Sequence, residues 1–123
     1  MGVEFRIESN IVVLTVFGRA ELGRQGKSWS DQVREAAETL GTPILLICKL
    51  EPGVEIPSFV LGAGAREAVS LASTFRAVAM VAEGEREQAM LRASAVAVAP
   101  SYPVRLFTNE AEARAWLSQF ADA

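Results

Sequence analysis

Few residues of this 123-residue chain have side chains that do chemistry, and Ser58 is the first candidate. It follows Pro57, where the spacing of apolar residues changes to that of a helix. A serine there could accept a phosphate or help bind an anion, because the first turn of a helix has unpaired N–H groups. It is also a preferred N-cap, a role that contributes about 1 kcal/mol. We expect the capping role, with Ser58 unphosphorylated, since Phe59 and Val60 crowd it.

The other reactive side chains argue against catalysis. The single cysteine, Cys48, lies in an apolar run, and the chain contains no histidine. A thiol in a buried strand without a neighbouring base behaves as an inert small hydrophobic residue. Without histidine, the commonest general base and the commonest metal ligand are both missing. Glu83, Glu85 and Glu87 could bind a cation, but they are better explained as the solvated start of a helix. We therefore expect no enzyme activity, no metal and no cofactor.

A binding site is the stronger hypothesis, and we place it in residues 51–61. Exposed apolar residues mark interaction sites, and Phe59 and Val60 open a helix there. Trp29 opens another helix at the same end of the expected sheet, so the two starts could form a cleft. The occupant is either an unknown protein partner or a small apolar, lipid-like ligand; ordinary core packing is the alternative explanation for Trp29. The candidate binding residues are Glu55, Ser58, Phe59, Val60 and Trp29.

Composition and charge narrow the class of protein. Apolar residues make up 50% of the chain and charged residues 22%, which is typical of a globular domain. The net charge is −3 and the basic residues are scattered, so we expect no nucleic-acid partner. The first ten residues lack the pattern of a signal peptide, and no apolar run reaches the ~20 residues of a membrane span. We expect a cytoplasmic protein, and a homodimer stays open.

The elements that must position these residues follow an α/β pattern in one domain, residues 1–123. We expect a mixed sheet of about five strands that begins with an antiparallel hairpin, whose turn uses Asn10 at positive φ. The run Ile44–Leu50 is apolar without alternation, which indicates a central strand covered on both faces. Pro103 places the last strand at an edge. The expected strands are Val3–Glu8, Ile11–Phe17, Ile44–Leu50, Phe75–Val81 and Val104–Phe107.

About four helices are expected between and after these strands. The first starts near Ser28, the second at Ser58 and the third in the acidic run at 83–87. Residues 94–99 fit a helix or a strand; we predict that the third helix continues through them. Asn109 and Glu112 have the spacing of a capping box for the last helix. The apolar stripe of that helix is expected to be core: Ala113, Trp116, Leu117 and Phe120.

Several short sequence motifs resemble those of proteins with the STAS fold, the fold of SpoIIAA-type anti-sigma-factor antagonists. FGRA at 17–20 is similar to the end of their second strand. VAMVAEGE at 78–85 and YPVRLFTNEAEARAWL at 102–117 resemble the fourth strand and the ending of the uncharacterised SpoIIAA-like group. The resemblance covers nearly the whole chain. It implies a STAS-like, bacterial regulatory module that binds another protein and catalyses no reaction.

The chain departs from the antagonists at their phosphorylated serine. In those proteins the serine lies in a motif like Asp-Ser-Ser-Gly at the start of the second helix. When that motif is aligned with this chain without gaps, it falls on Pro57, Ser58, Phe59 and Val60, and only the serine is kept. The SpoIIAA-like group generally lacks the motif as well. The resemblance therefore implies the fold and a binding role, but not a kinase-regulated switch.

Overall fold

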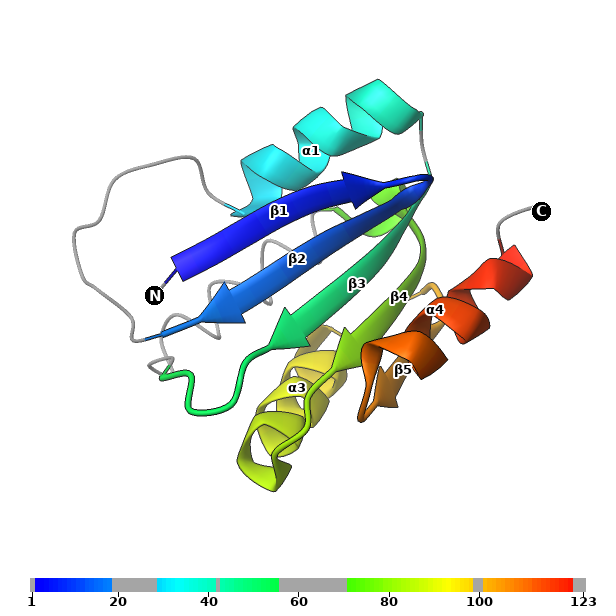
Figure 1. The fold of residues 1–123 in the computed structure, drawn as a ribbon. Coiled ribbons are helices and arrows are strands. Elements are labelled where there is room, and N and C mark those ends of the chain that lie inside the picture. Colours follow the sequence, from blue (N-terminus) through cyan, green and yellow to red (C-terminus); the bar gives the residue numbers. More distant parts are fainter. Residues whose placement is uncertain (1, 19–28, 42, 56–70, 99–100, 121–123) are drawn as a thin grey trace.

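The computed structural model describes residues 2–18, 29–41, 43–55, 71–98 and 101–120. Their core is one five-stranded mixed sheet in which every strand lies beside the next one in sequence, in the order β1-β2-β3-β4-β5 (Figure 1). The strands are β1 (Gly2–Glu8), β2 (Ile11–Phe17), β3 (Ile44–Leu50), β4 (Phe75–Val81) and β5 (Val104–Phe107). The predicted sheet and its N-terminal hairpin are confirmed.

The strand pairings explain the edges and the centre of the sheet. β1 pairs with β2 antiparallel, and the remaining three pairs are parallel. β3 is central and largely buried, as its apolar run predicts, and β5 is an edge strand. The hairpin turn corrects one expectation: Ser9, not Asn10, has the positive φ, at +57°. A short polar residue tolerates this conformation through local hydrogen bonding, which serine also offers.

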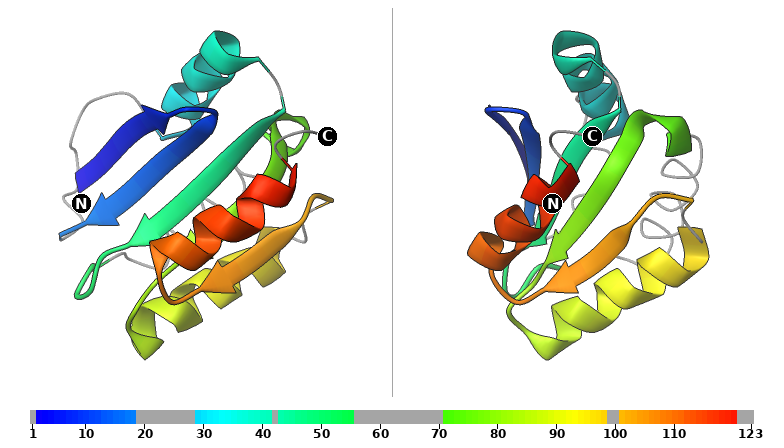
Figure 2. Two further views of the ribbon diagram at one scale, coloured as in Figure 1. Left: turned by 45° about the vertical axis from the view of Figure 1, so that its right-hand side comes forward. Right: turned by 90° about the vertical axis from the view of Figure 1, so that its right-hand side faces the viewer.

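Three α-helices lie within the described residues: α1 (Trp29–Leu40), α3 (Glu85–Val98) and α4 (Glu110–Leu117). Short 3₁₀ turns precede β4 and follow α4, at Ala72–Thr74 and Ser118–Phe120. The helix predicted from Ser58 lies outside the described residues. Residues 94–98 are helical, so the choice of helix is confirmed there. α1 and α3 cover one face of the sheet and α4 the other (Figure 2).

The two faces of the sheet bury two separate apolar clusters. On the larger, Val33 of α1 and Leu91 of α3 pack against alternate residues of the strands. On the smaller, Ala113 and Leu117 of α4 are both fully buried against β3 and β4. β3 supplies Leu46 to one cluster and Ile47 to the other, so it joins the two halves of the core. Unbroken apolar sequence is what such a two-sided strand requires.

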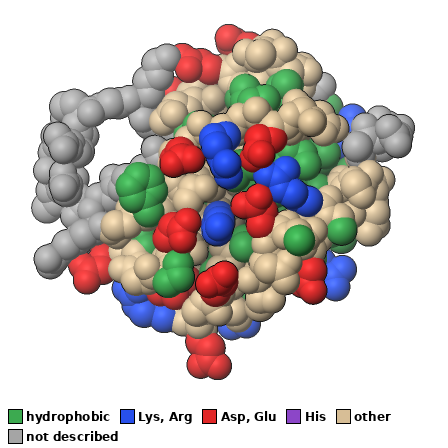
Figure 3. All heavy atoms as spheres, in the orientation of Figure 1, with side chains coloured by type: hydrophobic (Ala, Val, Ile, Leu, Met, Phe, Trp, Pro, Cys, Tyr) green, Lys and Arg blue, Asp and Glu red, His purple; other side chains and the backbone are tan. Residues whose placement is uncertain are grey.

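Beside α4, the same face of the sheet is charged rather than apolar. Figure 3 shows acidic and basic side chains gathered over it. Arg114 of α4 pairs with two carboxylates: its Nη2 is 2.7 Å from Oε2 of Glu8 in β1 and 2.9 Å from Oε2 of Glu110. The hydrogen bond with Glu110, followed by that with Glu8, raises the pKa of Arg114 above its ordinary value. The pair with Glu8 ties the last helix to the first hairpin.

The cap of α4 gives the first testable prediction. Oδ1 of Asn109 accepts a hydrogen bond from the backbone N–H of Glu112 at 2.8 Å, as the capping-box spacing predicts. Asn109→Ala removes that acceptor, and we expect it to lower the free energy of unfolding by about 1 kcal/mol in urea denaturation. Asn109→Ser is the control, because serine can accept the same bond. Equal losses from both variants would contradict the capping role.

Candidate functional site

The loop that follows β3, residues 51–55, is held firmly at the carboxyl end of the parallel strands. The N–H of Glu51 donates to the carbonyl of Val16 at 3.0 Å, and that of Glu55 donates to the carbonyl of Gly18 at 3.0 Å. Between them the chain turns at Pro52 and Gly53, where φ of the glycine is +82°. Ligands commonly meet α/β folds at such ends of strands. We call residues 51–55 the β3 loop.

The first turn of α3 contacts the β3 loop and supports it. Nη1 of Arg86 donates to the carbonyl of Val54 at 2.7 Å and lies 3.0 Å from Oε2 of Glu87. Val54 is fully buried, and Glu87 is only 5% exposed although it is an acid. The Glu87 carboxylate lies against Gly84, where the Cβ of any other residue would collide with it. One arginine thus joins a buried carboxylate to the backbone of the loop.

The sequence does not single out Arg86, and it indicates Glu87 only as a possible cation ligand in what is otherwise a solvated helix start. Glu83 and Glu85 are indeed exposed, but Glu87 is not. Part of the signal is in the spacing: Gly84 precedes the helix and a glutamate occupies its third position, which is the glutamate half of a capping box. A glutamate there turns back over the first turn, which brings its carboxylate toward the residue before the helix.

The structure describes only part of the predicted binding site. Glu55 is exposed at the end of the β3 loop. Ser58, Phe59 and Val60 lie outside the described residues, and so does the side chain of Trp29, although its backbone begins α1. The cleft between Trp29 and Phe59 therefore stays a prediction.

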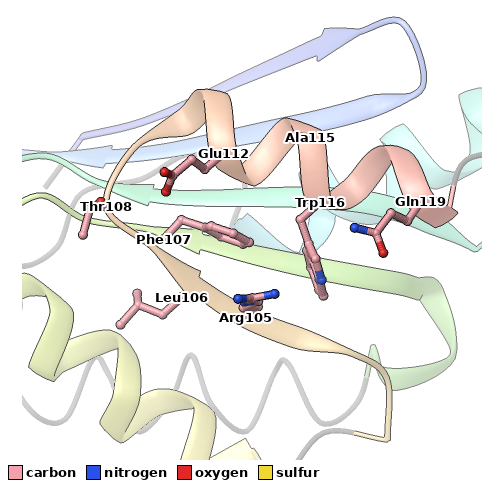
Figure 4. A pocket seen from close by; sticks show the side chains of 8 residues that line it. All are labelled: Arg105, Leu106, Phe107, Thr108, Glu112, Ala115, Trp116 and Gln119. Atoms are coloured by element: carbon pink, nitrogen blue, oxygen red, sulfur yellow. The ribbon is translucent and has the colours of Figure 1, made fainter.

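A hollow of about 520 Å³ lies elsewhere, between β5 and α4 (Figure 4). We call it the edge groove. β5 and the residue after it provide one wall, and α4 with its 3₁₀ extension provides the other. Its lining residues are Arg105, Leu106, Phe107, Thr108, Glu112, Ala115, Trp116 and Gln119. Trp116 corrects an expectation in part: it packs against the smaller core cluster, as predicted, but it is only partly buried and also borders this hollow.

Aromatic rings and one guanidinium form the floor of the edge groove. The ring centroid of Trp116 lies 5.7 Å from that of Phe107 and 5.0 Å from that of Phe120. Cζ of Arg105 lies 5.5 Å from the Phe107 centroid, in cation–π range. In Figure 4 the side chains of Arg105 and Trp116 point toward each other across the groove. The surface can stack against an apolar group and pair with a negative charge.

The remaining chemistry of the described residues is limited. Cys48 packs against the larger core cluster, and burial of its thiol raises its pKa to about 11. No group of three His, Cys, Asp or Glu side chains in the described part of the chain could hold a metal ion. No described helix is both long and apolar enough to cross a membrane.

Comparison with known proteins gives a family and a fold. A family model described as SpoIIAA-like matches residues 25–118. No curated protein matches. Among solved structures, the crystal structure of an uncharacterized protein from the DUF3478 family with a SpoIIAA-like fold, from Shewanella loihica PV-4, is 13% identical. The match covers 94% of this chain and 92% of that one, with a TM-score of 0.60.

The thiol gives a prediction about reactivity. Because only the thiolate attacks alkylating reagents, the raised pKa of Cys48 makes the folded protein slow to react at pH 8. We expect iodoacetamide to modify Cys48 about a hundredfold more slowly in buffer than in urea, measured by intact mass. The rate in buffer should rise as the pH approaches 11. Equal rates in buffer and urea would show that the thiol is neither buried nor shifted.

The position of Trp116 gives a second prediction here. A fully buried tryptophan costs about 3–5 kcal/mol when truncated to alanine, but a partly exposed one buries less area. We expect Trp116→Ala to lower the free energy of unfolding by about 2 kcal/mol, and Trp116→Phe by less, in urea denaturation. A loss in the full range of a buried tryptophan would restore Trp116 to the core.

Proposed function

Because the chain belongs to the SpoIIAA-like family, we propose that it is a non-catalytic regulatory or binding module that docks a protein partner through residues 51–61. The observation that carries the proposal is the support under the β3 loop. Arg86 fixes the carbonyl of Val54 from α3, and backbone bonds fix the two ends of the loop to β2 and to Gly18, the residue after it. A surface that is ordered before binding loses less conformational entropy when the partner arrives.

The exposed residues of the loop fit this role. Pro52, Gly53 and Glu55 are exposed while Val54 between them is buried, so the loop presents one side to solvent. The negative charge of Glu55 would help to orient the bound partner. Phe59 and Val60, a few residues further along the chain, would add contact area. Trp29 would contribute where the first helix begins.

Ser58 takes the role of a helix cap in this proposal. We expect Ser58→Ala to cost only about 1 kcal/mol of stability, and purified protein to have no phosphate on Ser58 by intact mass. Phe59→Ser should weaken partner binding more than it lowers stability. A phosphate on Ser58 would instead favour a kinase-regulated switch, and a Phe59→Ser variant that unfolds would place Phe59 in the core.

Site-specific crosslinking tests the docking surface directly. A photoreactive phenylalanine analogue replaces Glu55 in one variant and Ser73 in the control; Ser73 is exposed just before β4, at the opposite end of the strands. After irradiation in lysate of the native host, we expect a defined protein adduct from position 55 and none of that mass from position 73. Identical adduct patterns at both positions would contradict the proposed surface.

The support under the loop has its own matched pair of variants. Arg86→Met keeps the aliphatic chain but removes the bonds to Val54 and to Glu87. Arg92→Met removes an arginine one to two turns further along α3 that, among the described residues, bonds only Gln88. We expect Arg86→Met to lower the crosslinking yield from position 55 by about threefold to tenfold, as for the loss of one hydrogen bond of ordinary strength. Arg92→Met should leave the yield unchanged. Equal yields from the two variants would show that the loop needs no support from α3.

A further inference from the structure

β5 leaves one side of its backbone without a strand in the described part of the chain. It is the last strand of the sheet, and its other side is bonded to β4. Pro103 and Phe107 accept hydrogen bonds from Val78 and Ala82 at 2.9 and 3.1 Å. In a parallel ladder, alternate residues face the same neighbour. The N–H and C=O groups of Val104 and Leu106 therefore point away from β4, toward the free edge.

The edge groove lies directly beside these groups. Arg105 and Phe107 alternate with Val104 and Leu106 along the strand, and their side chains line the groove under α4. A strand added to the free edge would send every second side chain toward the same face of the sheet. Those side chains would enter the groove next to Arg105 and Phe107 (Figure 4). Backbone pairing and side-chain pockets are the two parts of strand addition.

The charges of the groove select what can enter it. Arg105 is exposed and stacks on Phe107, and it makes no ion pair with any of the described residues. By contrast, Arg114 pairs with two carboxylates. Glu112 lies at the opposite wall, near Phe107 and Thr108 (Figure 4). A carboxylate is therefore favoured opposite Arg105, and an uncharged apolar group is favoured opposite Phe107.

We propose that β5 and the edge groove bind an extended segment of another protein by strand addition, with an acidic residue opposite Arg105 and an apolar residue opposite Phe107. Residues opposite 105 and 107 are two positions apart in the added strand, so the motif has one residue between the acid and the apolar side chain. This goes beyond docking at the β3 loop, since the two surfaces share no residue.

A second copy of the chain fits less well than such a peptide. The two symmetric antiparallel registers with the greatest overlap of β5 set Arg105 opposite Arg105 or opposite Phe107 of the second copy. Neither register supplies a carboxylate, and the first places like charges face to face, which is destabilising. A charge on an edge strand also discourages aggregation. Protection against aggregation, however, requires neither the edge groove nor the stacking of Arg105 on Phe107.

Peptide selection tests the predicted motif. The probe is a library of random eight-residue peptides displayed on phage and selected against the full chain and against Arg105→Glu. We expect the full chain to enrich an acid and an apolar residue two positions apart, and Arg105→Glu to replace the acid with lysine or arginine. Arg76→Glu is unsuitable as a control because Arg76 bonds Phe120, so Arg34→Glu, at an exposed position of α1, is used. It should select the same motif as the full chain.

The same selected peptide, made synthetically, tests strand addition atom by atom. In NMR hydrogen-exchange measurements on the free protein, the amides of Arg105 and Phe107 should exchange slowly because they face β4. The Leu106 amide should exchange fast because it faces the free edge. Saturating peptide should slow exchange of the Leu106 amide by about tenfold or more. Val104→Pro removes the outward-pointing backbone N–H at the first position of an edge strand, where proline is tolerated. It should weaken binding of the peptide by about tenfold.

Three results would overturn the proposal. The first is selection of a motif that does not respond to Arg105→Glu. The second is a peptide that binds but leaves hydrogen exchange of the Leu106 amide as fast as before. This exchange is measured in the folded wild-type chain, so the stability of a variant does not affect the result. The third is a Leu106 amide already slow without peptide, in a sample that sedimentation shows to be dimeric, which would make a second copy the occupant.

Discussion

Burial of β3 on both faces is the constraint on which the rest of the structure depends. A strand with Leu46 on one face and Ile47 on the other leaves apolar surface exposed unless both sides are covered. Parallel neighbours on both edges then require crossovers, and crossovers bring helices to the faces. α1 and α3 cover one face, and α4 returns over the other. The same geometry gathers the ends of three strands beside the β3 loop, which is why support from α3 can reach Val54.

The fold could be predicted from the sequence because its signals are local and repeated. The bounds of β2, β3, β4 and β5 agree with their apolar runs, and the cap at Asn109 forms as its spacing indicates. Even the ambiguous stretch after Ala93 is helical through Val98, since no turn residue interrupts it. Where two local choices were equivalent, as for Ser9 and Asn10 in the hairpin turn, the sequence could not decide between them.

The candidate surfaces were harder to predict, because they depend on which elements meet. Glu87 is buried only because α3 begins under the β3 loop, and hydropathy assigns any glutamate to solvent. Trp116 has the spacing of a core residue, yet α4 lies over β4 near the sheet edge, so one side of its ring faces a hollow. Periodicity tells which face of a helix is apolar. It does not tell how far the sheet extends beneath that face.

The contact between Arg114 and Glu8 joins residues 106 positions apart, and this separation has a consequence for folding. Ala113 and Leu117 are the described residues of α4 that are fully buried over Ile47 and its neighbours. During synthesis, strands β1 to β4 therefore precede the helix that covers their second face. Until α4 has been made, that apolar face is open to chaperones or to other nascent chains, and such exposure favours aggregation. Closing such a distant contact also slows folding, because the loop entropy is lost before the packing is gained.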